Sequence, residues 1–113
     1  MSSDSKQGFF ADAQAVARLI PEGRVTSYGS IAGYLSSAKA ARMVGWAMKA
    51  SHGDETVPAH RVVNRIGVLS GKAHFATLSE MEASLAAEGI VVKDNQIVNF
   101  KEVFWDPSLE LKL

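Results

Sequence analysis

The first 51 residues carry three successive apolar stripes at helical spacing, separated by helix-breaking residues, and this pattern commits the chain to a largely helical fold. The first stripe runs from Phe9 to Ile20, and Pro21 and Gly23 end it. Its apolar members are Phe9, Phe10, Ala13, Val16, Ala17 and Ile20. With 113 residues, 47% of them hydrophobic and 21% charged, the chain has the composition of one globular domain with one modest core.

The second and third stripes predict a helix-turn-helix. Ser27 can cap a helix with Ile31, Ala32 and Leu35 on its inward face, and Ser36 and Ser37 interrupt the pattern. A third helix is expected from about Lys39 to Ser51, with an apolar face of Ala40, Met43, Val44, Ala47 and Met48. Its opposite face gathers Lys39, Arg42, Gly45, Trp46 and Lys49. Such a pair is typical of DNA-binding proteins, although many small helical domains contain one without binding DNA.

The second half of the chain predicts one helix and one hairpin. Residues 52–58 are expected to form a polar loop, and residues 59–76 a mixture of extended chain, turn and loop. Ser79 and Glu82 have the spacing of a capping box, with Leu78 placed for a hydrophobic staple, and the helix they start should end at Gly89.

Apolar runs on either side of residues 93–96 predict a β-hairpin. The tail aromatics Phe104 and Trp105, with Pro107, are expected to dock on the domain. The predicted fold is therefore mainly α with a small β component, a winged helix-turn-helix-like single domain over residues 1–113.

Charge is distributed unevenly along a chain whose formal net charge is zero. Residues 24–72 contain only two acidic residues but seven basic ones: Arg24, Lys39, Arg42, Lys49, Arg61, Arg65 and Lys72. Seven of the twelve acidic residues lie in the last third. This polarity can place one basic face against phosphates, and the alternative is that the charges are scattered over the surface without function.

Several classes of site and location are disfavoured by the sequence. No apolar run is long enough to span a bilayer and the N-terminus lacks the pattern of a secretory signal, so a cytoplasmic, nucleoid-associated location is expected. The chain has no cysteine, and therefore no disulfide, thiolate metal site or thiolate nucleophile. His52, His60 and His74 lack metal-ligand spacing, so neither a metal nor another cofactor is expected.

The most specific feature is an ordered set of motifs. Residues 20–29 read IPEGRVTSYG, residues 40–45 read AARMVG, residues 58–63 read PAHRVV, and Glu88-Gly89 follows. This order and spacing, over about residues 9–92, resemble the DNA-binding domain of the O6-alkylguanine-DNA alkyltransferases, which carry Pro-Cys-His-Arg at the third motif. With Ala59 in place of that cysteine, and with Trp105-Asp106-Pro107 near its end, the chain is similar to the alkyltransferase-like proteins.

The resemblance implies that the chain binds double-stranded DNA containing O6-alkylguanine from the minor groove and flips the damaged base out of the stack. Arg42 matches the arginine finger that fills the vacated space, and Tyr28 the tyrosine that presses the 3′ phosphate of the target nucleotide. Ala41 and Gly45 match small residues that let the recognition helix lie close to the groove. Lys39, Lys49 and Ser27 complete the expected DNA-binding set.

The resemblance also implies a pocket for the flipped base, formed by Pro58, Ala59, His60, Val62, Ser51 and Lys72. Lys72 stands where alkyltransferase-like proteins can place an arginine against the base, and Ser51 stands where the alkyltransferases keep a bracing asparagine. Ala59 is expected to leave a roomier pocket than a tryptophan would, so bulky O6 adducts should fit. His60 and Glu88 match the family's base and its orienting acid, but without a nucleophile they are expected to be vestigial.

The expected function is that of a monomeric, non-enzymatic sensor that blocks or flags the lesion and directs it to nucleotide excision repair proteins. One alternative is a helix-turn-helix transcriptional regulator without lesion specificity, which would read sequence in the major groove as a dimer. Another is a hydrolase using Ser51, His60 and Glu88, although no nucleophile turn or oxyanion arrangement is recognisable.

Overall fold

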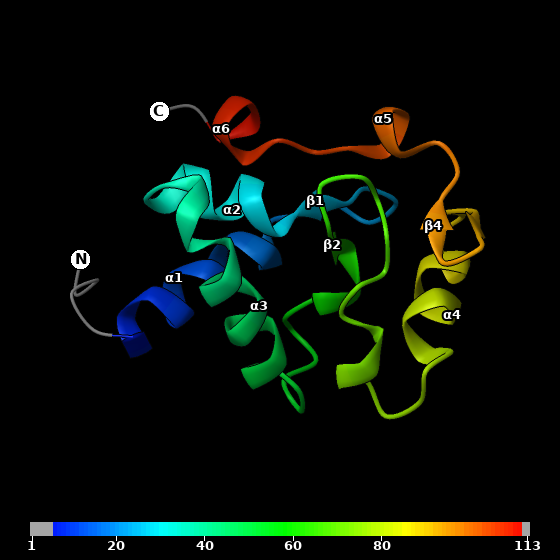
Figure 1. Ribbon diagram of the computed structural model, residues 1–113, viewed down its shortest axis with the longest axis horizontal. Helices are drawn as coiled ribbons and strands as arrows, with labels where there is room; N and C mark the ends of the chain where they lie inside the picture. Colours follow the sequence, from blue (N-terminus) through cyan, green and yellow to red (C-terminus); the bar gives the residue numbers. More distant parts are fainter. Residues whose placement is uncertain (1–5, 112–113) are drawn as a thin grey trace.

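The computed structural model describes residues 6–111 and shows a mainly helical chain with a small β component, as the sequence predicts (Figure 1). The β component comprises the predicted hairpin and a second, parallel two-stranded sheet that the sequence did not indicate. Its helices and strands are α1 (Lys6–Arg18), β1 (Thr26–Ser27), α2 (Tyr28–Leu35), α3 (Ala41–Ala50), β2 (Val62–Val63), α4 (Glu80–Ala87), β3 (Val92–Lys93), β4 (Gln96–Ile97), α5 (Phe100–Val103) and α6 (Pro107–Glu110). Three 3-10 turns are η1 (Ala38–Ala40), η2 (Ala59–Arg61) and η3 (Lys72–His74). Among the described residues, none of the helices has the length and apolarity to cross a membrane.

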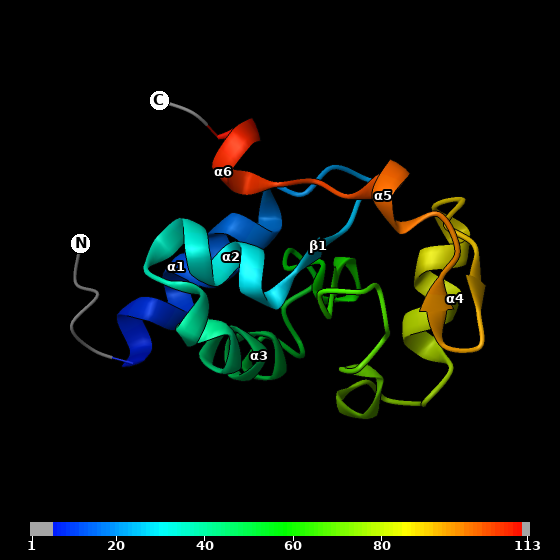
Figure 2. The same cartoon turned by 45° about the horizontal axis from the view of Figure 1, so that its top comes forward.

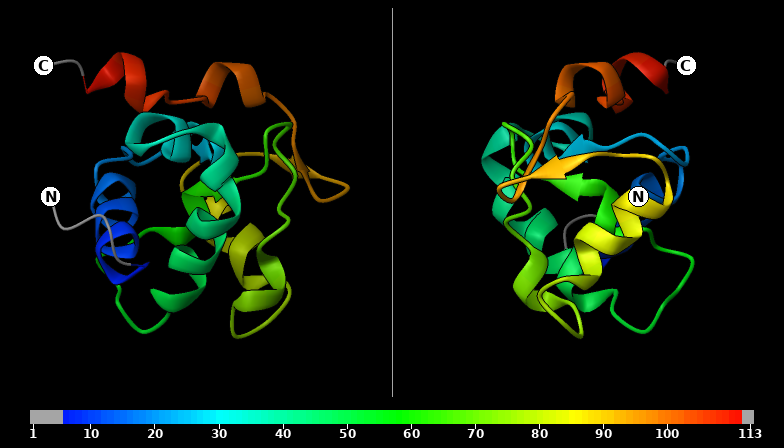
Figure 3. Two further views of the ribbon diagram at one scale, coloured as in Figure 1. Left: turned by 60° about the vertical axis from the view of Figure 1, so that its left-hand side comes forward. Right: turned by 90° about the vertical axis from the view of Figure 1, so that its right-hand side faces the viewer.

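Helices α1, α2 and α3 pack around the first of two apolar clusters. Val16, Ile20, Ile31, Val44 and Met48 are buried there, on the faces that the periodicity predicts. Figure 1 shows these three helices on one side of the molecule and α4 with the β3–β4 hairpin on the other, with β1 and β2 between them. The second view of Figure 3 looks onto the side formed by α4 and the hairpin.

The helix-turn-helix forms with one shift of boundary. Ser27 caps α2 as predicted, because its backbone is extended and its Oγ accepts a hydrogen bond of 3.0 Å from the Ser30 amide. The helix expected from Lys39 to Ser51 begins instead at Ala41, after the turn η1. Residues 38–40 form the 3-10 turn instead, and Ala40, at the N-cap of α3, makes no side-chain capping bond.

A parallel ladder between β1 and β2 brings two distant motifs together, since Thr26 pairs with Val62 and Ser27 with Val63. The C-terminal segment adds to it, because the Val25 amide donates to the Val103 carbonyl at 2.9 Å and the Trp105 amide donates to the Val25 carbonyl at 2.7 Å. Figure 2 shows this segment running along one edge of the molecule from α5 to α6. Trp105 is only 4% exposed, so the predicted docking of the tail is confirmed.

The second cluster lies under α4 and includes Met81, Leu85, Ile90, Ile97 and Leu69. Helix α4 ends as predicted: Gly89 has a φ of +84°, and the Ile90 amide donates to the Leu85 carbonyl at 3.0 Å. The hairpin is also confirmed, with β3 antiparallel to β4. Its turn residues, Asp94 and Asn95, both have positive φ, as a tight hairpin turn requires.

The capping box predicted at the start of α4 is wrong. The Ser79 backbone has a φ of −94° and a ψ of −8°, close to the helical region, and its hydroxyl makes no capping hydrogen bond. A capping serine needs an extended backbone to aim its oxygen at the third helical amide. The hydrophobic staple is absent as well, because Leu78 is 66% exposed.

Ser27→Ala is predicted to lower the free energy of unfolding by about 1 kcal/mol, because the α2 cap is lost. Chemical denaturation followed by circular dichroism measures the change. Ser37→Ala is the matched control, since Ser37 precedes η1 without a side-chain capping bond and its replacement should have little effect. Equal losses in the two variants would contradict the capping role of Ser27.

Candidate nucleic-acid interface

A buried carboxylate at the end of α4 holds three segments of the chain together. Glu88, whose side chain is 9% exposed, accepts hydrogen bonds from the His60 ring nitrogen Nε2 at 2.6 Å and from the Gly23 amide at 2.8 Å. The Arg61 guanidinium donates to both Glu88 oxygens, at 2.8 to 3.0 Å. Arg61 also donates to the Ile20 carbonyl just after α1, at 2.8 Å. These contacts fix η2 against α1 and α4.

The same contacts set the charge state of Glu88. Burial alone raises the pKa of its carboxyl, but the hydrogen bonds from Arg61, the Gly23 amide and His60 outweigh burial and lower it to about 2 from an ordinary value of 4.5. The expected pairing of His60 with Glu88 is therefore present. The sequence interpretation missed Arg61, although its place next to His60 in the PAHR string was the available signal.

Ala59 begins η2 and presents a methyl group at the position where the alkyltransferases, which the sequence resembles, have their nucleophilic cysteine. The nearby Ser51 is 5% exposed, and its hydroxyl donates to the Met48 carbonyl at 2.6 Å. This bond directs the hydroxyl into the end of α3, so the geometry argues against the hydrolase that Ser51, His60 and Glu88 could have formed. Within residues 6–111, His, Asp and Glu side chains form no cluster of three that could hold a metal ion.

A groove of about 440 Å³ lies along α3, and we call it the α3 groove. It gathers five of the seven residues expected to contact DNA: Tyr28, Ala41, Arg42, Gly45 and Lys49. Its other lining residues are Trp46, Ser70, Gly71 and His74. The last three come from the loop before and within η3, and no local pattern in the sequence indicated that this loop returns to α3.

Tyr28 is held between α3 and that loop. Burial raises the pKa of its phenol, and a hydrogen bond with the Ser70 side chain partly offsets the rise. Gly71 leaves room for it, because a Cβ at that position would lie 2.5 Å from the Tyr28 hydroxyl oxygen and would displace that side chain. A Cβ on Gly45 would lie 4.0 Å from the Tyr28 ring, at ordinary contact distance. Ser27 is buried, and its hydroxyl oxygen accepts the capping hydrogen bond of α2. It therefore positions Tyr28 and does not line the groove.

Arg42 is exposed on the outer face of α3, and its guanidinium carbon lies 5.5 Å from the centre of the Trp46 ring. This is the geometry of a cation–π contact, which orders a side chain that would otherwise sample many rotamers. Trp46 is 44% exposed, so the pair stands at the surface of the groove. A planar cation is therefore displayed on α3 beside the small residues Ala41 and Gly45.

Other predicted residues lie elsewhere. Lys39 is exposed in η1, and Lys72 is half-buried at the start of η3; neither lines the α3 groove. Val62, expected in the base pocket, is fully buried in the first cluster. The basic segment is not one solvent-facing surface, because Arg61 binds Glu88 and Arg24 donates to the carbonyls of Val103 and Phe104.

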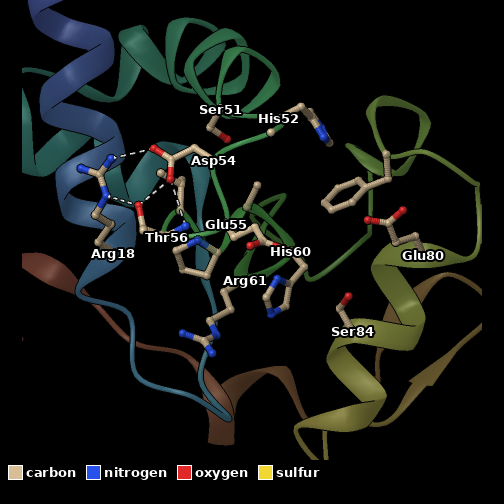
Figure 4. A pocket seen from close by; sticks show the side chains of 15 residues that line it. Arg18, Ser51, His52, Asp54, Glu55, Thr56, His60, Arg61, Glu80 and Ser84 are labelled. Atoms are coloured by element: carbon tan, nitrogen blue, oxygen red, sulfur yellow. Dashed lines mark hydrogen bonds and ion pairs between the residues drawn. The ribbon is translucent and has the colours of Figure 1, made fainter.

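The remaining pocket residues lie around a second space. Ser51, Pro58, Ala59 and His60 line a cavity of about 350 Å³ between the 51–61 segment and α4, which we call the rear cavity (Figure 4). On its other side, Ala59 lines a narrow hollow of about 10 Å³ next to the α3 groove. The roomy pocket expected from the small Ala59 side chain is therefore not open on the groove side in this structure.

The arrangement of a helix-turn-helix with the PAHR turn behind it defines the class of protein. Residues 8–90 match the family model for the DNA-binding domain of 6-O-methylguanine DNA methyltransferase. The chain belongs to this family.

Particular relatives are similar over most of this length. The chain is 36% identical over 91 residues to the DNA base-flipping protein of Escherichia coli K12, which covers 80% of this chain and 69% of that protein. It is 36% identical over 92 residues to alkyltransferase-like protein 1 of Schizosaccharomyces pombe, covering 78% and 85% respectively. The crystal structure of S. pombe Atl1 in complex with damaged DNA containing O6-carboxymethylguanine superposes with a TM-score of 0.78 at 32% identity, over 89% of this chain and 97% of that one.

Glu88→Gln is predicted to lower the free energy of unfolding at neutral pH by about 1.5–3 kcal/mol, because Arg61 loses its charged acceptor. The wild-type pKa of about 2 lies below the ordinary 4.5, so the carboxylate stabilises the fold above pH 4.5 and this contribution is lost as the pH falls toward 2. Denaturation at several pH values should therefore show that the free energy of unfolding falls less between pH 4.5 and pH 2 in Glu88→Gln than in the wild type. Glu82→Gln, a change at an exposed position on α4, serves as the control. If the free energy of unfolding of Glu88→Gln depended on pH as steeply as that of the wild type, the stabilising role of the Glu88 carboxylate would be contradicted.

Proposed function

We propose that this chain is a non-enzymatic sensor that binds O6-alkylguanine in duplex DNA with the damaged base turned out of the stack. The observation that carries this proposal is the α3 groove, which places Tyr28, Arg42 and two small residues beside a frame that keeps His60 and Glu88 but has Ala59 at the nucleophile position. The S. pombe relative crystallised with damaged DNA supports the same ligand class.

Arg42 is suited to occupy the space that a flipped base leaves. Its guanidinium is planar, permanently charged and able to donate hydrogen bonds to the orphaned partner base. Ala41 and Gly45 lie in the same groove as the finger, and their small side chains let α3 approach the minor groove closely. Tyr28 is braced by Ser70 and Gly71, so its hydroxyl has a defined position from which to press a phosphate. Base extrusion costs a few kcal/mol, which these contacts offset.

Alkyl transfer requires a group at position 59 that can attack carbon, and the methyl group of Ala59 cannot. His60, paired with Glu88 at 2.6 Å, keeps the arrangement of a base with its orienting acid, but no thiol stands at position 59 for it to deprotonate. No cysteine exists elsewhere in the sequence. The alkyl group therefore stays on the base, and the protein acts by marking the site.

We propose that a bound monomer blocks or flags the lesion in the cytoplasm and that nucleotide excision repair proteins then act on it. This part of the proposal is supported by the resemblance to alkyltransferase-like proteins, and by a site that can bind a lesion without removing it.

A single duplex carrying either guanine or O6-methylguanine tests the proposal at one fixed salt concentration, because phosphate contacts make every affinity salt-dependent. We expect tighter binding to the O6-methylguanine duplex, with the methyl group still on the base when the DNA is recovered and analysed by mass spectrometry. Equal affinities with a strong dependence on flanking sequence would instead indicate a transcriptional regulator. Recovery of unmodified guanine would show that the chain is an enzyme.

Arg42→Ala is predicted to weaken binding to the O6-methylguanine duplex by about tenfold to a hundredfold, because nothing then fills the vacated stack. Its thermal melting temperature should stay close to that of the wild type, since Arg42 is exposed. Lys101→Ala removes an equal charge from exposed helix α5 and is the matched control. Similar losses in the two variants would mean that Arg42 contributes only general electrostatic attraction.

A further inference from the structure

Two aromatic rings separate the narrow hollow from the rear cavity. His52, just beyond α3, and Phe75, just beyond η3, meet edge to face, with ring centroids 5.0 Å apart and an interplanar angle of 87°. Both residues line the narrow hollow and both line the rear cavity, as does Ala59. The ring pair and the Ala59 methyl group therefore form the wall between the two spaces.

The two spaces differ greatly in size. The narrow hollow, at about 10 Å³, has room for about one water molecule, whereas the rear cavity, at about 350 Å³, is within the range of small-molecule sites. A group that enters from the α3 groove and is longer than a methyl group must therefore pass the wall. His52 is exposed and Phe75 is half-buried, so their side chains can rotate without unfolding either helix.

The rear cavity also has a charge preference. Its two arginines are already paired, Arg18 with Asp54 at 3.2 Å and Arg61 with Glu88 at 2.8 Å. Two further carboxylates in its lining, Glu55 and Glu80, have no ion pair within residues 6–111. Figure 4 shows Glu80 and Ser84 on α4 across the cavity from Arg18 and Asp54, with His60 between them. The unpaired charges are negative, so the cavity favours neutral or cationic groups over anionic ones.

We propose that His52 and Phe75 form a gate through which the O6 substituent of an extrahelical guanine reaches the rear cavity, and that this cavity selects neutral or cationic substituents over anionic ones. The proposal rests on the proposed function, because it requires that the base be turned toward Ala59. In this proposal Phe75 and His52 determine how large an O6 adduct can bind, and Glu80 helps to determine which adduct charges are favoured.

Four duplexes of one sequence test the selectivity of the wild-type protein at fixed salt. They carry O6-methylguanine, O6-(2-hydroxyethyl)guanine, O6-(2-aminoethyl)guanine or O6-carboxymethylguanine. We expect the aminoethyl adduct to bind about tenfold more tightly than the carboxymethyl adduct, because the two differ in charge near Glu55 and Glu80. Glu80→Gln should reduce this ratio about fivefold, and the matched control Glu82→Gln, on the same helix but outside the cavity lining, should leave it unchanged.

Phe75→Ala tests the gate. We expect it to raise the affinity for the hydroxyethyl adduct, relative to the methyl adduct, by about threefold to tenfold, because a ring contact no longer has to be broken. Phe104→Ala is the matched control, since it removes another half-buried ring that contacts an aromatic neighbour, Phe100, but lines neither space. His52→Ala removes the exposed partner of the ring pair and should act in the same direction, so the gate can be tested even where Phe75→Ala fails to fold in thermal melting.

The outcomes separate this proposal from the one on which it rests. A wild-type preference for O6-methylguanine over guanine, with no change in the hydroxyethyl to methyl ratio in either gate variant, would overturn the gate. The same preference with equal affinities for the aminoethyl and carboxymethyl adducts would overturn the charge selection. Absence of any preference for O6-methylguanine would overturn the proposed function, and the gate with it.

Discussion

The position of η2, the turn behind α3, depends on one buried carboxylate. Glu88, at the end of α4, accepts hydrogen bonds from the Gly23 amide, the His60 ring and the Arg61 guanidinium, which come from two other parts of the chain. A carboxylate this buried is stable as an ion only because its acceptor sites are filled by donors. The result is that η2 has a fixed place between the two apolar clusters. The turn that carries Ala59 is therefore held in place by side-chain hydrogen bonds from both neighbouring segments.

The groove in front of this frame is built by a different set of contacts. The short β1–β2 ladder and the Ser27 cap set the start of α2, and so the place of Tyr28. The loop before η3 then closes over Tyr28 through Ser70 and Gly71. Arg42 is held over Trp46 on the neighbouring face. The contacts that hold η2 and the contacts that form the α3 groove are thus largely separate, so the side chain at position 59 can change without altering the groove.

Much of the fold could be predicted because it follows from local rules. Apolar spacing placed α1, α2 and most of α3, Ser27 marked a helix start, Gly89 marked a helix end, and the turn at Asp94-Asn95 marked the hairpin. One local prediction failed, the capping box at Ser79, and the other failures were long-range. The arginines Arg24 and Arg61 bind carbonyls and a carboxylate far along the chain and do not join a basic surface. Likewise Phe75, in a segment without periodicity, lines with Ala59 the narrow hollow where a small side chain was expected to leave a roomy pocket.

What the sequence alone determined is chemical and local. A chain without cysteine has no thiolate to accept an alkyl group. The PAHR and AARMVG motifs identify the residues of the η2 turn and of helix α3 without any knowledge of the tertiary structure. What only the tertiary structure decided is which of these residues share a space. The narrow hollow, the rear cavity and the ring pair between them are formed by residues from α3, η2, η3 and α4. Their relation depends on how distant segments pack around the two apolar clusters, and packing between distant segments leaves no periodic signal in the sequence.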